Sequence, residues 1–206
     1  MHLIDFPNGA YLRQSIESDR ADLYRVCVQT GIIGSDASHL FRMPQMLGEI
    51  YVGPYLTFEP NYSFTIVDGE ITGYLLATLD TAAFEEREEV QWWPALRSKY
   101  LNVGIENFTD EEKSLFAHMQ NPPRTPKAIT DEFPSQLHID LVTKSQRKGF
   151  GKPLIMYLLK QLTEANSPGV HLHVNPINDN AIGFYEKLGF VIAHKSTDEW
   201  LMTRKL

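Results

Sequence analysis

A glycine-rich stretch flanked by basic residues is the part of this sequence best suited to bind an anion. Gly149 and Gly151 lie among three basic residues, Arg147, Lys148 and Lys152. An apolar run precedes the stretch and leucines at helical spacing follow it, so the glycines are expected between a strand and a helix. The first N–H groups of a helix have no partner within it, and the helix dipole adds positive charge there. Because glycine has no Cβ atom, a phosphate can approach this backbone closely, and we predict a phosphate-binding loop.

The spacing of the loop excludes two common nucleotide motifs. A Walker loop has glycine where Gln146 stands and Ser or Thr after its lysine, whereas Pro153 follows Lys152. The dinucleotide fingerprint Gly-x-Gly-x-x-Gly is also absent. What remains is Gln146-x-x-Gly149-x-Gly151, which resembles the pyrophosphate loop of the GCN5-related N-acetyltransferase (GNAT) superfamily, where it holds coenzyme A. An ordinary glycine turn before a core helix is the alternative interpretation of this motif alone.

A second stretch, residues 178–190, resembles the same superfamily. Its Asn178, Ala181 and Tyr185 match the signature Asn-x-x-Ala-x-x-x-Tyr-x-Lys-x-Gly-Phe. Two motifs in the superfamily's order imply an α/β GNAT fold with a mixed, mostly antiparallel central sheet. The resemblance further implies splayed parallel strands 4 and 5, flanking helices, and a helical insertion between strands 3 and 4.

Composition limits the class of protein and its partners. The 206 residues, 43% hydrophobic and 22% charged, predict a single globular domain over residues 1–206. The net charge of -7 argues against nonspecific binding to nucleic acid or anionic membranes and is compatible with a cationic acceptor. The sequence shows no leader and no apolar run of about 18 residues, so we expect no membrane span and a cytoplasmic localisation. Cys27, the single cysteine, is expected in the core.

The elements that position these motifs can be followed along the chain. A first strand is expected from Tyr11 to Ile16, followed by a helix around Cys27. Residues 35–60 predict a second helix that ends at Gly53-Pro54. Two apolar runs flank Asp68-Gly69, which is the strongest hairpin signal in the chain.

An insertion of about residues 82–134 separates the third and fourth predicted strands. Its acidic run from Glu85 to Glu89 is interpreted as a solvated helix face rather than a metal site. The adjacent Trp92 and Trp93 either line a pocket or fasten the insertion to the body of the domain.

The insertion also resembles a known domain. The pattern Trp92-x-Pro-x-x-x-x-Lys-Tyr100, a later Thr-x-x-Glu helix start at Thr109, and Phe133-Pro-Ser are similar to the acetyltransferase-like C-terminal domain of eukaryotic O-GlcNAcase. That domain lacks an intact glycine loop and is regarded as a pseudo-acetyltransferase. This chain keeps the loop, so it is closer to the bacterial relatives of that domain, and no glycosidase domain is expected.

The resemblance implies where acetyl-CoA and the catalytic groups lie. Pantetheine is expected between the splayed strands near residues 137–142 and 170–174, where unpaired backbone groups need partners. Tyr185 matches the superfamily's acid, which protonates the departing thiolate. Asp140 is the first candidate for the base that deprotonates the amine and His138 the second; a purely supporting role is the alternative for both. The residues expected to contact the cofactor are Leu141, Val142, Thr143, Gln146, Arg147, Lys148, Gly149, Phe150, Gly151, Lys152, Asn175, Asn178, Ala181 and Tyr185.

Together the motifs imply an N-acetyltransferase that moves acetyl from acetyl-CoA to an amine acceptor by direct attack in a ternary complex. The alternative is a non-catalytic module that binds a protein or a CoA thioester. No metal site is expected, because His171 and His173 lack further ligands at suitable spacing. The acceptor stays open, as does the choice between a monomer and a homodimer.

Overall fold

The computed structural model describes all residues from 1 to 206 and contains one mixed β-sheet. The strands are β1 (His2–Asp5), β2 (Tyr11–Gln14), β3 (Ser63–Asp68), β4 (Glu70–Thr78), β5 (Ser135–Leu141), β6 (Gly169–Val174), β7 (Val191–Lys195) and β8 (Trp200–Lys205). Their order in the sheet is β1-β2-β3-β4-β5-β6-β8-β7. The sequence did not predict β1, so the strands expected as the fourth and fifth are β5 and β6.

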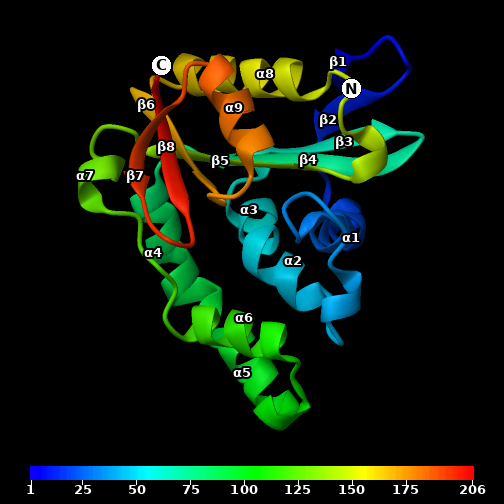
Figure 1. The fold of residues 1–206 in the computed structure, drawn as a ribbon, viewed down its shortest axis with the longest axis vertical. Coiled ribbons are helices and arrows are strands. Elements are labelled where there is room, and N and C mark those ends of the chain that lie inside the picture. The colour runs from blue at the N-terminus through cyan, green and yellow to red at the C-terminus, as the bar shows by residue number, and fades with distance from the viewer.

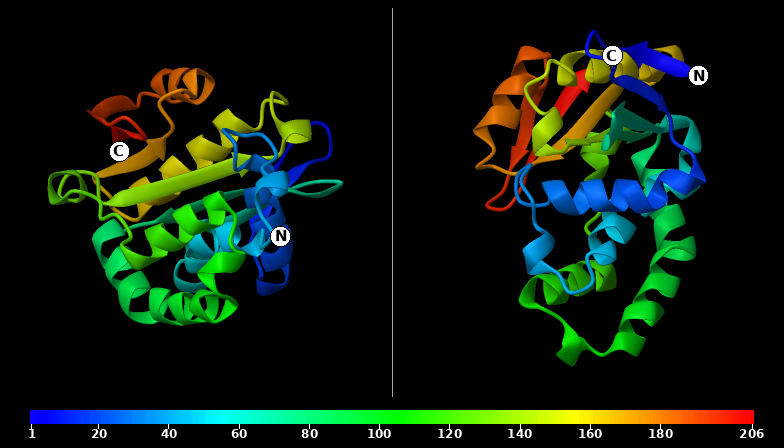
Figure 2. Two further views of the ribbon diagram at one scale, coloured as in Figure 1. Left: turned by 60° about the horizontal axis from the view of Figure 1, so that its bottom comes forward. Right: turned by 90° about the vertical axis from the view of Figure 1, so that its right-hand side faces the viewer.

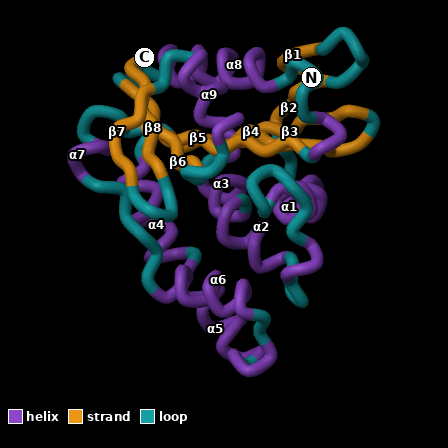
Figure 3. The backbone as a smooth tube through the Cα atoms, viewed as in Figure 1, coloured by secondary structure: helices purple, strands orange, loops and turns teal.

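Helices cover both faces of this sheet (Figure 1). They are α1 (Arg20–Thr30), α2 (Gln45–Tyr51), α3 (Gly53–Phe58), α4 (Thr81–Gln91), α5 (Trp93–Val103), α6 (Asp110–Gln120), α7 (Lys127–Thr130), α8 (Gly151–Glu164) and α9 (Asp179–Lys187). Helices α8 and α9 lie on one face, and α1 to α3 lie on the other (Figures 1 and 2). The insertion supplies α4 to α7, of which α5 and α6 lie farthest from the sheet (Figure 3).

The parallel strands β5 and β6 separate soon after they begin. Their pairing is confined to Ser135 with Val170 and Gln136 with His171, and every other strand pair in the sheet is antiparallel. Beyond these residues β5 continues without ladder bonds to β6, so backbone groups on that side have no strand partner. The predicted fold, with its splayed parallel pair and helical insertion, is confirmed.

Apolar packing holds β5 from both faces. On one face the leucines of α8, Leu154, Leu158 and Leu162, are fully buried against the sheet. On the other face α1 packs Leu23 and Val26 against β4. A separate cluster of buried side chains, which includes Trp93, holds the insertion helices together. Because both faces are covered, β5 lies between two packed layers.

The turn chemistry explains one confirmed prediction and one error. Gly69 has a φ of 76° and joins β3 to β4, as the hairpin signal predicted. In residues 35–60, α2 ends at Tyr51, just before Gly53-Pro54 as predicted, but Pro54 lies in the first turn of a further helix, α3, which the sequence did not predict. Proline is suited to a first helical turn, where its missing N–H has no partner to lose. None of the helices has both the length and the hydrophobicity that a membrane span requires.

Candidate active site

Strand alternation places two polar side chains of β5 on the face covered by α1 and α2. Leu137 belongs to the core cluster that includes α8, and Ile139 packs against that cluster. His138 and Asp140 point to the opposite face, where they line cavities. The alternation predicted from the sequence therefore presents both candidate bases to the same side of the sheet.

Tyr74 of β4 completes a cluster with these two residues. It lies directly across the ladder from Asp140, and its hydroxyl donates a hydrogen bond to Asp140 Oδ2. His138 Nε2 lies 3.1 Å from the same carboxylate oxygen and 3.4 Å from the tyrosine hydroxyl. Burial, followed by the charge of Asp140, raises the pKa of Tyr74 well above its ordinary value. Tyr74 therefore keeps its proton. The sequence pattern did not point to Tyr74 as a site residue, and the strand register places it there.

The hydrogen-bond pattern determines which nitrogen of His138 is free. A carboxylate only accepts hydrogen bonds, so the tautomer that fits has a proton on Nε2, which donates to Asp140. Nδ1 of a neutral His138 then carries a lone pair that can accept a proton. The side chains of His138 and Asp140 are 31% and 25% exposed, so a substrate can reach them.

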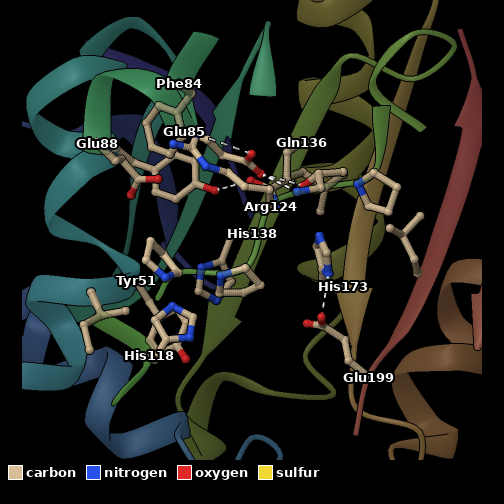
Figure 4. A pocket seen from close by; sticks show the side chains of 18 of the residues that line it. Tyr51, Phe84, Glu85, Glu88, His118, Arg124, Gln136, His138, His173 and Glu199 are labelled. Atoms are coloured by element: carbon tan, nitrogen blue, oxygen red, sulfur yellow. Dashed lines mark hydrogen bonds and ion pairs between the residues drawn. The ribbon is translucent and has the colours of Figure 1, made fainter. Parts of the chain in front are cut away.

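Two cavities meet at His138. The first, here called the insertion cleft, has a volume of about 440 Å³ and lies between α2, α4, the connector after α6, and the strands from β5 to β8. Its lining includes Tyr51, Phe84, Glu88, Gln136, His138 and Glu199 (Figure 4). The second, here called the α1 cavity, has a volume of about 500 Å³ and is lined by Cys27, Asp140 and His138 among others. An acceptor in the insertion cleft would reach His138, whose Nε2 lies beside Asp140.

The glycine loop presents a row of free donors at the start of α8. The backbone N–H groups of residues 147–152 form no hydrogen bond within the chain, and α8 has no side-chain cap. Gly149 has a φ of 84°, a conformation that side chains disfavour, and open space surrounds it. A Cβ at Gly151 would lie 3.1 Å from the ring of Phe184, so this glycine allows α8 to approach α9. The loop thus has the donors and the access that an anion needs.

Two polar side chains of the loop are engaged within the chain. Gln146 Nε2 donates to the carbonyl oxygens of Gly34, at 2.8 Å, and Leu141, at 2.9 Å. It therefore ties the loop to the end of β5. Lys148 Nζ lies 2.6 Å from Asp68 Oδ2, and this pairing lowers the pKa of Asp68. The exposed Arg147 and Lys152 form no ion pair within the chain, so they supply the loop's available positive charge.

The residues expected along the pantetheine differ in whether they have free backbone hydrogen-bonding groups. The N–H of Val142 donates to the carbonyl of Thr72 at 2.9 Å, and its own carbonyl accepts from Ser145 at 2.8 Å. Val142 therefore has no free backbone donor, and the unpaired groups of β5 lie before it. Thr143 is exposed at the turn that follows β5.

The asparagines of the second motif shape the chain around α9. The Asn178 side chain caps α9 by accepting from the Ala181 N–H at 3.1 Å. Asn175 accepts from the N–H of Ile177 at 3.1 Å. In this structure both asparagines hold the loop that leads from β6 to α9.

Tyr185 of α9 lies on the opposite side of β5 from the His138–Asp140 pair. Its ring packs against Phe184 and Phe190, with centroid separations of 5.3 and 5.5 Å. Burial, followed by the charge of Asp140, raises the pKa of Tyr185, so the hydroxyl is protonated at neutral pH. The hydroxyl forms no hydrogen bond within the chain, so it is available to donate one.

The insertion corrects one expectation from the sequence. The acidic run is not uniformly solvated, because Glu85 and Glu88 line the insertion cleft and Glu88 is only 9% exposed. The two tryptophans divide the roles that the sequence left open. Trp92 donates from Nε1 to the Glu49 carbonyl at 2.8 Å and fastens the insertion to α2, whereas Trp93 lines the cleft.

The histidines of β6 have different surroundings. His171 is fully buried, and its Nδ1 lies 2.7 Å from the carbonyl oxygen of Phe133. Burial lowers the pKa of His171 to about 4, so the ring is neutral and donates this bond. His173 lines the insertion cleft, where its Nδ1 lies 2.9 Å from Glu199 Oε2.

Sequence comparisons relate the chain to two described groups of proteins. Residues 133–201 match the family model described as FR47-like protein. The chain is 26% identical over 181 residues to Protein O-GlcNAcase of Mus musculus, an alignment that covers 86% of this chain and 20% of that protein. The chain thus spans about a fifth of the length of this curated relative.

Solved structures share the fold over almost the whole chain. The crystal structure of SsHAT has a TM-score of 0.85 and 28% identity, and the match covers 95% of this chain and 98% of that chain. The PaiA N-acetyltransferase from Thermoplasma acidophilum in complex with coenzyme A has a TM-score of 0.57 at 12% identity, with coverage of 96% and 99%. At that identity the second likeness concerns the fold alone. Together, these matches support a GNAT superfamily member, and the solved structures share its fold.

Proposed function

We propose that this domain, residues 1–206, is an acetyl-CoA-dependent N-acetyltransferase that acts on an amine. The observation that carries the proposal is the junction at the end of β5, where the gap to β6, the free donors of the glycine loop and the His138–Asp140 pair come together. The coenzyme A complex of a protein with the same fold supports the choice of cosubstrate.

Binding follows from the free backbone groups. The N–H groups of residues 147–152 hold the pyrophosphate, with Arg147 and Lys152 adding charge at the rim. Unpaired groups of β5, up to Leu141, pair with the pantetheine amides in the gap. Thr143 and the β6–α9 loop, with Asn175, line the two sides of the cofactor's path.

The catalytic roles follow from the protonation states. A free alkylammonium has a pKa of about 10.4, so the acceptor needs a base. His138, oriented by Asp140, takes the proton as the amine nitrogen attacks the thioester carbon. Tyr185 gives its proton to the sulfur as the C–S bond breaks. Attack is direct because Cys27 is a poor nucleophile: burial raises the pKa of its thiol above the ordinary value.

Calorimetric titration with acetyl-CoA separates this function from a non-catalytic module that binds only a protein. We expect saturable binding, with CoA competing for the same site. Absence of binding at about 1 mM acetyl-CoA would favour the module, as the relationship to O-GlcNAcase would then suggest. Binding of acetyl-CoA would support the cofactor site, and turnover then tests the chemistry.

A further inference from the structure

Glu88 is a buried carboxyl group without a partner in the insertion cleft. It is 9% exposed and forms no hydrogen bond or ion pair within the chain. The other acidic residues of the run have partners: Thr125 for Glu85, Arg124 for Glu86 and Arg97 for Glu89. A buried carboxylate with no partner is unfavourable, so Glu88 is the group in this cleft that most needs a ligand.

The surroundings of Glu88 suit a cation on an alkyl chain. Tyr55, Phe84 and Trp93 line the same cleft, with the rings of Tyr55 and Phe84 4.6 Å apart. Figure 4 shows Glu88 on one side of the cleft, with His138 between it and the His173–Glu199 pair. Aromatic faces attract ammonium groups, and a carboxylate supplies the opposite charge.

We propose that Glu88 binds a second ammonium group of the acceptor and that the acceptor is a small alkyl diamine. This inference rests on the proposed function: one amine reacts beside His138 while the other is held at Glu88. The cleft volume of about 440 Å³ is that of a small-molecule site. The net charge of -7 also favours an acceptor with two positive charges.

Proton linkage gives the proposal a second signature. Burial, together with the negative charges of Glu85 and Glu89 and against the opposing charge of Arg124, raises the pKa of Glu88 to about 8. An ammonium group favours the carboxylate, so diamine binding below pH 8 releases a proton from Glu88. The preference for a diamine over a monoamine should therefore increase as the pH rises towards 8. The other titratable groups that line the cleft around Glu88 are Tyr51, Tyr55, His118, His138, His173, His194 and Glu199.

The test compares pentanediamine with pentylamine as acceptors. In wild type the ratio of their kcat/KM values should favour the diamine. Glu88→Gln, which keeps the shape and removes the charge, should lower that ratio about ten- to a hundredfold. Glu86→Gln is the matched control, because Glu86 lies on the same helix with a side chain that is 71% exposed, and it should keep the wild-type ratio.

The proposal would be overturned if folded Glu88→Gln kept the wild-type ratio of kcat/KM values, either with both values unchanged or with both reduced equally. Acetylation of monoamines would still support the proposed function in either case. If wild type acetylates no amine, the proposed function fails, and calorimetry tests Glu88 separately. Pentanediamine should then bind wild type with release of a proton, measured in two buffers of different ionisation heat, and Glu88→Gln should lose that release. If pentanediamine bound wild type below pH 8 without releasing a proton, the proposed role of Glu88 would be wrong.

Discussion

The smallest unit of the proposed chemistry is the contact between His138, Asp140 and Tyr74. Asp140 accepts from Tyr74 and lies 3.1 Å from His138 Nε2, so one carboxylate both orients the imidazole and stabilises its positive charge. Tyr74 is fully buried and holds the carboxylate in place. This arrangement assigns the proton transfer to a pair of residues rather than to one.

Removing the charge of Asp140 tests that assignment. Asp140→Asn keeps the size of the side chain but no longer stabilises a protonated His138, so kcat should fall by about a hundred- to ten-thousandfold. Tyr74→Phe removes one hydrogen bond and should cost less, about tenfold. Both are measured as pH–rate profiles, with acetyl-CoA affinity as the control. A near-wild-type profile for folded Asp140→Asn would contradict the assignment.

The raised pKa of Glu88 also predicts how stability depends on pH. The folded chain holds this proton up to about pH 8, whereas the unfolded chain loses it near 4.5. Between these values the folded state binds more protons, so its free energy of unfolding falls as the pH rises, and it levels off above 8.

Glu88→Gln removes this loss of stability. The Tm of Glu88→Gln should match that of wild type near pH 4.5 and exceed it above pH 8. The corresponding gain in the free energy of unfolding above pH 8 is on the order of a few kcal/mol. Glu86→Gln should follow wild type throughout. Thermal unfolding at both pH values measures the effect, and a Glu88→Gln protein less stable than wild type above pH 8 would contradict the burial argument.

Among the elements, the glycine loop and α8 carry the cofactor site through backbone geometry. The backbone N–H groups from Arg147 to Lys152 are free, whereas the side-chain ammonium group of Lys148 is already paired with Asp68. Side-chain charge at Lys148 should therefore matter less than the shape of the loop.

Substitution of Gly149 tests this difference. Gly149→Asp adds a negative charge where the phosphates would lie; two unit charges about 4 Å apart repel by roughly 4 kcal/mol at an effective dielectric of about 20. CoA affinity should fall several hundredfold, whereas Lys148→Ala should cost about tenfold or less. Gly9→Asp is the control, because Gly9 has the same φ of 84° and equally open space. If folded Lys148→Ala bound CoA more weakly than Gly149→Asp, the loop would bind through side-chain charge.

The sequence predicted the elements whose signals are local. The Asp68-Gly69 hairpin, the apolar face of α8 and the glycine loop all depend on residues close together in the chain, and each is found. The short strand β1 was missed because its partner β2, not its own pattern, makes it a strand. Tyr74 and Glu88 were missed because register and helix packing, which join distant segments, bring them to the site.

On the scale of the whole molecule, the sheet would separate the two proposed substrates. The loop, α8 and α9 lie on one face of the sheet (Figures 1 and 2), and the insertion cleft is lined by residues of α2 and α4, which lie on the other side. The proposed acetyl-CoA would thus enter from one face and the acceptor from the other, which is the geometry of a ternary complex. Direct attack requires acetyl-CoA and the acceptor to be bound at the same time. Double-reciprocal plots of the initial rate, taken at several fixed concentrations of the second substrate, should therefore intersect.

Product analysis at saturating acetyl-CoA tests the central claim most directly. Wild type is incubated with a panel of monoamines and diamines, and acetylated amine and free CoA are quantified by mass spectrometry. We predict that the two products appear in equal amounts and that Asp140→Asn slows both alike. If wild type binds acetyl-CoA but forms no acetylated amine from any member of the panel, the domain is a binding module and the proposed acetyltransferase activity is wrong.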